Sequence, residues 1–87
     1  MGDERGSGTS GGEAVPGVGV TGVIRLGQFL KLAGLAEDGA QAREIVRGGD
    51  VSVNGAPETR RGRQLSAGDL IEVATPAGVL RARVTSA

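Results

Sequence analysis

The chain has 87 residues and a mass of 8.7 kDa, which suffices for one small domain and excludes a multidomain enzyme. It contains no histidine and no cysteine, so imidazole bases, thiolate nucleophiles, disulfides and His/Cys metal sites are excluded. Ten basic residues balance ten acidic ones, but residues 1–22 hold one basic and three acidic residues. Residues 23–87 hold nine and seven, so we expect a mildly basic domain behind an acidic lead-in.

Residues 1–22 are predicted to be a disordered, glycine-rich lead-in, because they hold eight of the 17 glycines and few large apolar residues. The valines at 15, 18 and 20 alternate weakly, and a strand formed on docking is the alternative. No apolar run reaches the ~18 residues of a membrane span, and the N-terminus lacks the pattern of a secretory signal. We therefore expect a cytoplasmic protein.

Residues 23–87 are predicted to form an α+β domain in which two short helices pack on a small antiparallel sheet. The first helix has a stripe of apolar residues at helical spacing, formed by Leu26, Phe29, Leu30 and Ala33, and it is expected to end at Gly34. The second helix is expected to begin at the cap Asp38 and to end at Gly48-Gly49. Its buried edge is predicted to be Ala42, Ile45 and Val46.

Alternating apolar residues and turn signals predict the sheet that follows. Residues 51–53 run into Asn54-Gly55, the strongest local signal for a hairpin with a type I′ turn, which requires positive φ at both residues. Two further turns, at 68–69 and 76–78, precede the strands expected at 70–73 and 79–84.

The polar side of each predicted helix is basic. Arg25, Gln28 and Lys31 lie opposite the apolar stripe of the first helix, and Arg43 lies outside that of the second. An ordinary solvated surface is the simpler interpretation of these charges taken alone.

The run 59–64 places Arg60, Arg61 and Arg63 within four positions, where their guanidiniums repel one another unless an anion is present. Guanidinium groups suit phosphate oxygens, and Gly62 lets the backbone turn so that the three can converge on one ligand. The alternative is a solvated loop whose arginines pair with acidic residues at 58, 69 or 72. We favour anion binding.

The anion is suggested by what the sequence lacks. Phe29 is the single aromatic residue, and the helical period assigns it to the core, so a stacking platform for splayed bases is excluded. A basic surface without aromatics suits the backbone of folded RNA, or nonspecific contact with duplex DNA.

Four segments, in this order and spacing, resemble the RNA-binding domain named after small-subunit ribosomal protein S four: residues 25–31, 41–46, 49–55 and 68–73. The run 59–62 resembles that of the short stand-alone bacterial members. The resemblance implies an αL-type fold whose helices and sheet carry a basic surface for structured RNA, commonly ribosomal or transfer RNA.

The resemblance also implies a set of RNA-binding residues: Arg25, Gln28, Lys31, Arg43, Asn54, Arg60, Arg61 and Arg63. For Asn54, the requirements of the turn are the stronger explanation. Many members begin the second helix with Ser-Arg where this chain has Asp38-Gly39, so a phosphate contact is missing there.

We therefore expect a noncatalytic, monomeric module without metal or cofactor that binds ribosomal or transfer RNA in ribosome assembly or translation. One alternative is a protein-interaction adaptor in which the run 59–64, the arginine loop, docks an acidic partner. A DNA-binding helix-turn-helix is disfavoured because residues 39–41 offer few base-reading side chains. An enzyme is disfavoured because no pair of carboxylates has a spacing suited to acid–base catalysis.

Overall fold

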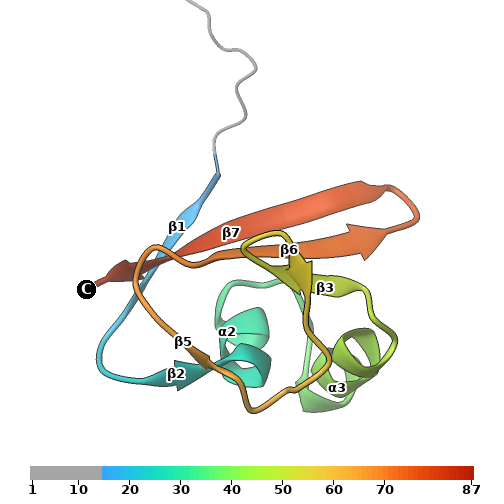
Figure 1. Cartoon of the computed structure of the whole chain (residues 1–87), viewed down its shortest axis with the longest axis horizontal. Helices are drawn as coiled ribbons and strands as arrows, with labels where there is room; N and C mark the ends of the chain where they lie inside the picture. Colours follow the sequence, from blue (N-terminus) through green and yellow to red (C-terminus); the bar gives the residue numbers. More distant parts are fainter. Residues whose placement is uncertain (1–14) are drawn as a thin grey trace, which may run out of the picture.

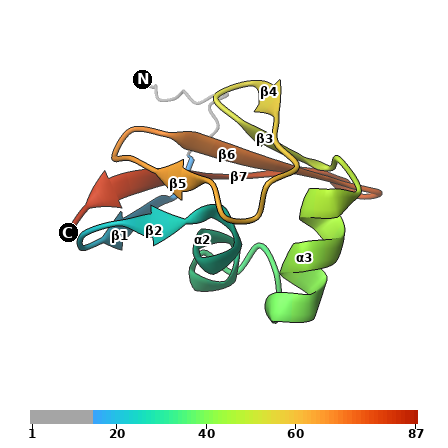
Figure 2. The same cartoon turned by 60° about the horizontal axis from the view of Figure 1, so that its bottom comes forward.

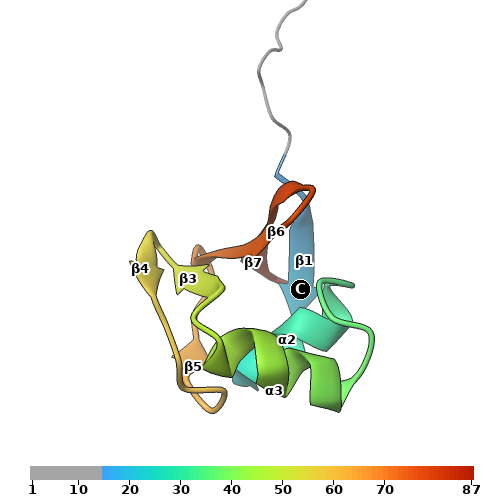
Figure 3. The same ribbon diagram turned by 90° about the vertical axis from the view of Figure 1, so that its right-hand side faces the viewer.

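The computed structural model describes residues 15–87, so most of the expected lead-in, residues 1–14, lies outside the described residues. A five-stranded sheet in the order β1-β7-β6-β3-β4 carries both helices on one face (Figure 1, Figure 3). The elements are β1 (Gly17–Val20), β2 (Ile24–Arg25), α2 (Leu26–Leu32), α3 (Gly39–Arg47), β3 (Val51–Val53), β4 (Ala56–Pro57), β5 (Gln64–Leu65), β6 (Leu70–Thr75) and β7 (Gly78–Ser86). The predicted α+β class with two short helices is confirmed.

Both helices begin and end where local signals place them. In α2, Ala33 is the C-terminal cap, and Gly34 follows with a φ of 75°, which favours glycine. At the start of α3, the side chain of Asp38 accepts a hydrogen bond from the backbone N–H of Gln41 at 2.8 Å. The predicted cap of the second helix is therefore confirmed.

The predicted hairpins are also present. Asn54 has a φ of 53° and Gly55 a φ of 87°, as the type I′ turn between β3 and β4 requires. Gly78 opens β7 with a φ of 133°, after the turn that joins β6 to β7. A small second sheet, in which β2 pairs with β5, holds the start of α2 beside the segment 58–65 (Figure 2).

Residues 17–20 differ from the expectation of a disordered lead-in, because they form β1, which pairs in parallel with β7. The sheet is therefore mixed rather than wholly antiparallel. Val18 and Val20 pack half-buried against the core, and Gly17 lets the backbone approach Thr85 closely. This strand depends on a partner more than 60 residues away, which the weak local alternation of valines did not reveal.

The core lies between α2, α3 and the inner face of the sheet. Its largest fully buried side chains are Phe29, Leu26, Leu30, Ile71, Val46, Val51, Val53, Val73 and Val84. Phe29 is among them, so its predicted place in the core is confirmed. Leu80 is 45% exposed and lies near the end of the β6–β7 hairpin at which Thr75 pairs with Gly78.

Candidate nucleic-acid interface

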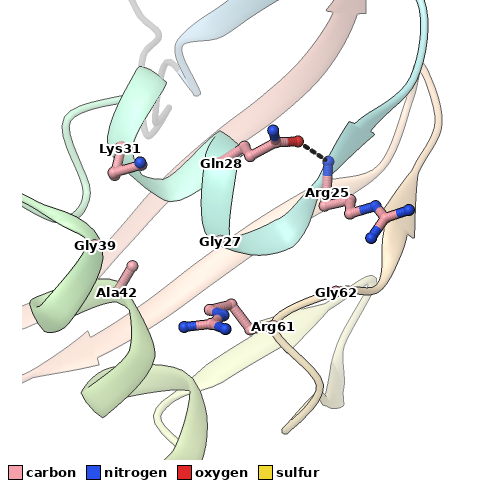
Figure 4. Close-up of a pocket in the computed structure, with 8 residues that line it drawn as sticks. All are labelled: Arg25, Gly27, Gln28, Lys31, Gly39, Ala42, Arg61 and Gly62. Carbon is pink, nitrogen blue, oxygen red and sulfur yellow. Dashed lines mark hydrogen bonds between the residues drawn. The ribbon is translucent and has the colours of Figure 1, made fainter.

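A shallow cleft of about 340 Å³ lies between α2, the start of α3 and the loop that precedes β5. Its lining residues are Arg25, Gly27, Gln28, Lys31, Gly39, Ala42, Arg61 and Gly62 (Figure 4). Four of the eight residues predicted to bind RNA line this cleft: Arg25, Gln28, Lys31 and Arg61. They come from two segments that lie far apart in the sequence.

Gln28 and Lys31 lie on one side of α2 because they are spaced three apart, whereas Arg25, expected on the same helix face, ends β2 with an extended backbone and caps α2. The side-chain oxygen of Gln28 accepts a hydrogen bond from the backbone N–H of Arg25 at 3.0 Å, which fixes Gln28 over the first turn. In Figure 4, Lys31 lies near α3, whereas the guanidinium of Arg25 lies at the rim and points away from Arg61.

The arginine loop is fastened to the start of α2 by two backbone hydrogen bonds. The N–H of Leu26 donates to the carbonyl oxygen of Arg63 at 2.8 Å, and the N–H of Gly27 donates to that of Arg61 at 2.9 Å. These bonds satisfy two of the amide groups that the first turn of a helix leaves without partners. The loop and the helix therefore form one connected unit.

The side chain of Arg61 lies directly against Gly27. A Cβ at position 27 would come within 3.0 Å of Cδ of Arg61 and closer still to Cγ. The missing side chain therefore makes room for the aliphatic part of Arg61, whose guanidinium extends between α2 and α3 (Figure 4). Sequence analysis missed this role of Gly27; a glycine in the first turn of a helix, where it lowers helix propensity, was the available signal.

The three arginines of the loop do not converge, contrary to expectation. The Glu58 carboxylate accepts hydrogen bonds from Nε of Arg60 at 3.0 Å and from Nη1 of Arg63 at 3.1 Å. Glu58 itself is only 6% exposed. The Glu58 carboxylate thus supplies the anion for the guanidiniums of Arg60 and Arg63. Of the three loop arginines, only Arg61 lines the cleft.

Hydrogen bonds from Arg60 lower the pKa of Glu58 from 4.5 to about 2, and the bond from Arg63 adds to this effect. The ionised carboxylate therefore stabilises the folded chain fully above pH 4.5, and this contribution is lost as the pH falls toward 2. Burial raises the pKa of Asp69, but hydrogen bonds from Ser66 and Asn54 and the charge of Arg63 lower it by more.

Above pH 4.5 we expect the natural protein to have a higher free energy of unfolding than the Glu58→Gln variant. This difference in unfolding free energy should narrow as the pH falls from 4.5 to 2. Only the natural chain loses a folded-state ion pair in that window, whereas Asp69 titrates in both proteins. Urea unfolding at several pH values measures the difference. A gap that stays constant throughout would contradict the assigned role of the Glu58 charge.

Asn54 lies outside the cleft and holds two turns together. Its side-chain oxygen accepts from the N–H of Leu70 at 2.9 Å, and its Nδ2 donates to Asp69 at 3.0 Å. Both ends of the amide are thus occupied within the chain, which agrees with the turn-based explanation of this residue.

Arg43 also lies outside the cleft. It lines a separate depression on the outer side of α3 with Ala40, Gln41, Glu44 and Arg47. The predicted surface is therefore divided between a cleft and a neighbouring helix face.

The cleft carries positive charge that no acidic group in the described part of the chain pairs with. Among residues 15–87, ion pairs within 4.0 Å involve Arg60, Arg63 and Arg81, and none involves Arg25, Lys31 or Arg61. Within the same range, no group of three or more His, Cys, Asp or Glu residues could hold a metal ion. No helix in the described part of the chain is long and apolar enough to cross a membrane.

Comparison with known families identifies the domain. The family model described as S4 domain matches residues 20–79. The chain belongs to the S4 domain family. The match extends the resemblance found over residues 25–73 and includes α2, α3, the arginine loop and the β3–β4 hairpin.

Two curated relatives are similar to this S4 domain over most of their own length. The "Probable ribosome maturation protein RlbA" of Bacillus subtilis (strain 168) is 45% identical over 53 residues, which is 61% of this chain and 75% of that protein. The "Putative RNA-binding protein YbcJ" of Escherichia coli (strain K12) is 41% identical over 51 residues, or 59% of this chain and 73% of that protein. Both relatives are therefore little longer than the domain.

Proposed function

We propose that this S4 domain binds folded RNA, ribosomal or transfer RNA, without catalysing a reaction, and that it acts in ribosome maturation or translation. It does so as a cytoplasmic monomer without metal or cofactor. Family membership and the names of the two relatives support RNA as the partner. The domain of residues 23–87, extended by β1, is the binding unit.

The observation that carries the proposal is the gathering of Arg25, Lys31 and Arg61 around one shallow cleft, with no described carboxylate within 4.0 Å of them. Guanidinium and ammonium groups bind phosphate oxygens, and Gln28, whose side-chain oxygen is engaged by Arg25, offers its NH₂ group as a donor to a ribose or base edge. Because Phe29 is buried, base stacking on an aromatic ring contributes nothing, and recognition rests on the shape and backbone of the RNA.

The remaining predicted residues have supporting places in this proposal. Arg43 extends the basic surface along α3, and Arg60 adds a largely exposed guanidinium from the arginine loop. Arg63 and Asn54 act through the fold, since their side chains are engaged within the chain.

The proposal is tested by measuring binding of purified ribosomal RNA, and separately of transfer RNA, at several salt concentrations. Each phosphate neutralised contributes roughly −0.7 to −0.9 to the slope of log affinity against log salt. About three to five contacts predict a slope of roughly −2 to −4.5. A slope near zero with both RNAs would overturn the proposal.

We expect Gly27→Ala to weaken RNA binding roughly five- to eightfold, because the new Cβ displaces Arg61 and one phosphate contact at ~0.1 M salt is worth roughly that factor. Alanine raises helix propensity by roughly 1 kcal/mol, which offsets the local crowding, so the unfolding free energy changes little. Filter binding and thermal unfolding of the same preparation measure both quantities. Full affinity in a folded Gly27→Ala variant would show that the position of Arg61 is immaterial.

We expect Gly39→Arg to bind RNA several-fold more tightly and with a steeper salt slope. Gly39 lines the cleft, and nothing lies within 4 Å of a Cβ built there, so an arginine adds a cation without a clash. Ala77→Arg adds the same charge at the exposed tip of the β6–β7 hairpin and is the matched control. An equal gain from both variants would attribute the effect to net charge alone.

A second candidate function is docking of an acidic protein partner. Exposed Val23 and Leu32 line a groove that shares Gln28 and Lys31 with the cleft, so a partner with apolar and acidic side chains would fit there. Co-purification from cells before and after nuclease treatment separates the two functions. A partner protein that stays bound after nuclease favours docking, and loss of all bound material favours RNA.

A further inference from the structure

Glu58 is a buried carboxylate for which the proposed function has no direct use. It follows β4 and is 6% exposed, although it lies beside a surface that we propose to meet the negative charge of RNA. Its backbone N–H donates to the carbonyl oxygen of Val51 at 2.9 Å, which fixes its main chain to β3. A buried acid near an RNA site costs affinity through repulsion unless it performs a compensating task.

The Glu58 carboxylate accepts hydrogen bonds from two residues of the arginine loop, Arg60 and Arg63. Its Oε2 accepts from both the backbone N–H and Nε of Arg60, at 2.9 and 3.0 Å, and its Oε1 accepts from Nη1 of Arg63 at 3.1 Å. The two arginines that it holds lie on either side of Arg61 in the sequence. Glu58 therefore holds the chain on both sides of Arg61.

The same segment is fastened to α2 at Arg61 and Arg63 through their carbonyl oxygens. The loop is thus held through the side chains of Arg60 and Arg63 by the Glu58 carboxylate, and through the carbonyl oxygens of Arg61 and Arg63 by the first turn of the helix. The side chain of Arg61 lies against Gly27 and lines the cleft.

We propose that Glu58 is a positioning residue of the RNA-binding cleft, which holds Arg60 and Arg63 so that Arg61 is presented between α2 and α3. This inference rests on the proposed function. Removing a negative charge beside an RNA site would by itself strengthen RNA binding, whereas this inference predicts that neutralising Glu58 weakens it. Glutamine at position 58 places an NH₂ group where a carboxylate oxygen accepted, so at least one arginine loses its partner.

The competing expectation is that Glu58 only withholds the two arginines from RNA, in which case its neutralisation strengthens binding. The exposed fractions favour positioning. The side chain of Arg63 is 33% exposed, and its backbone is tied to α2, so release from Glu58 does not bring it to the surface. Arg60 is 76% exposed while paired, so it already faces solvent.

The test compares Glu58→Gln with Glu72→Gln, using purified ribosomal RNA and transfer RNA as probes at ~0.1 M salt. Glu72 accepts from Nε of Arg81 at 2.8 Å and alternates with the core residues Ile71 and Val73, so it lies on the opposite face of the sheet. Both variants change the net charge equally. We expect Glu58→Gln to bind about five- to tenfold more weakly and Glu72→Gln to bind as well as the natural protein or slightly better.

A double-mutant cycle distinguishes positioning from a general loss of structure. In the Arg61→Ala background, Glu58→Gln should cause little further loss, because the side chain through which Glu58 acts is already absent. Equal effects of Glu58→Gln in both backgrounds, or tighter binding by Glu58→Gln, would overturn the inference. If Glu58→Gln does not fold, Glu58→Asp keeps the charge and shortens the reach, and the same cycle is run with it.

The outcomes separate this inference from the proposed function. Two outcomes would refute the RNA-binding role of the cleft, and this inference with it. One is that RNA binding by the natural protein does not depend on salt for either RNA, and the other is that Arg61→Ala binds as tightly as the natural protein. If Arg61→Ala binds weakly but Glu58→Gln behaves like Glu72→Gln, the cleft stands and only the positioning role is lost.

Discussion

Replacing Arg25, Lys31 and Arg61 together by alanine is expected to weaken RNA binding roughly one hundred- to five-hundredfold at ~0.1 M salt. Each cation that neutralises a phosphate contributes roughly 0.7 to 0.9 to the salt slope, which corresponds to about five- to eightfold in affinity at that salt concentration. The slope should therefore become shallower by about 2 to 3. Binding measured at four or five salt concentrations gives both numbers.

The fold should survive this triple substitution. None of the three side chains forms an ion pair within residues 15–87, and Arg25, at the end of β2, and Lys31, on α2, are both exposed. Surface substitutions of this kind usually change the unfolding free energy by less than about 0.5 kcal/mol each. Thermal unfolding of the triple variant should accordingly stay close to that of the natural protein.

The matched control removes the same charge elsewhere, through Arg47, Arg81 and Arg83. Arg81 pairs with Glu72 and Arg83 donates to the carbonyl oxygen of Gly68, and none of the three residues lines the cleft. A several-fold loss is expected from the weaker long-range field, which falls off over a Debye length of ~10 Å at 0.1 M salt. Equal losses in the two triple variants would mean that RNA responds to net charge and not to the cleft.

The helices and hairpin turns could be predicted because nearby residues determine them. Asp38 caps α3 through a residue three positions away, and Asn54-Gly55 adopts the positive φ values that its turn type requires. Gln28 and Lys31 share a helix face by their spacing alone. Each of these features is fixed within a few residues of sequence.

The features that sequence reasoning missed depend on contacts between distant segments or on one choice among several partners. β1 exists because β7 offers an edge, and the position of Arg61 follows from a glycine on a helix more than 30 residues earlier. The sequence of the arginine run was compatible with two arrangements, convergence of the arginines on a ligand or pairing with an acidic residue. The buried Glu58 pairs with Arg60 and Arg63, and its burial is a property of the folded chain that local sequence does not reveal.

Phe29→Ala is expected to remove about 3–5 kcal/mol of stability, because Phe29 is completely buried and is the largest side chain of the core. A domain of this size has a total unfolding free energy of about 4–11 kcal/mol. The substitution should therefore lower the melting temperature by tens of degrees or unfold the chain at 25 °C. Circular dichroism during heating and urea unfolding measure the loss.

Two further variants assign this loss to packing and also test how RNA is recognised. Leu32→Ala shortens an apolar side chain of the same helix that is 56% exposed, so its stability should change by less than about 1 kcal/mol. Phe29→Leu keeps the core largely filled, at a cost of about 1–2 kcal/mol, and removes the aromatic ring. Recognition through phosphates predicts full RNA affinity for the folded Phe29→Leu variant, whereas a large loss would mean that the ring reaches a base.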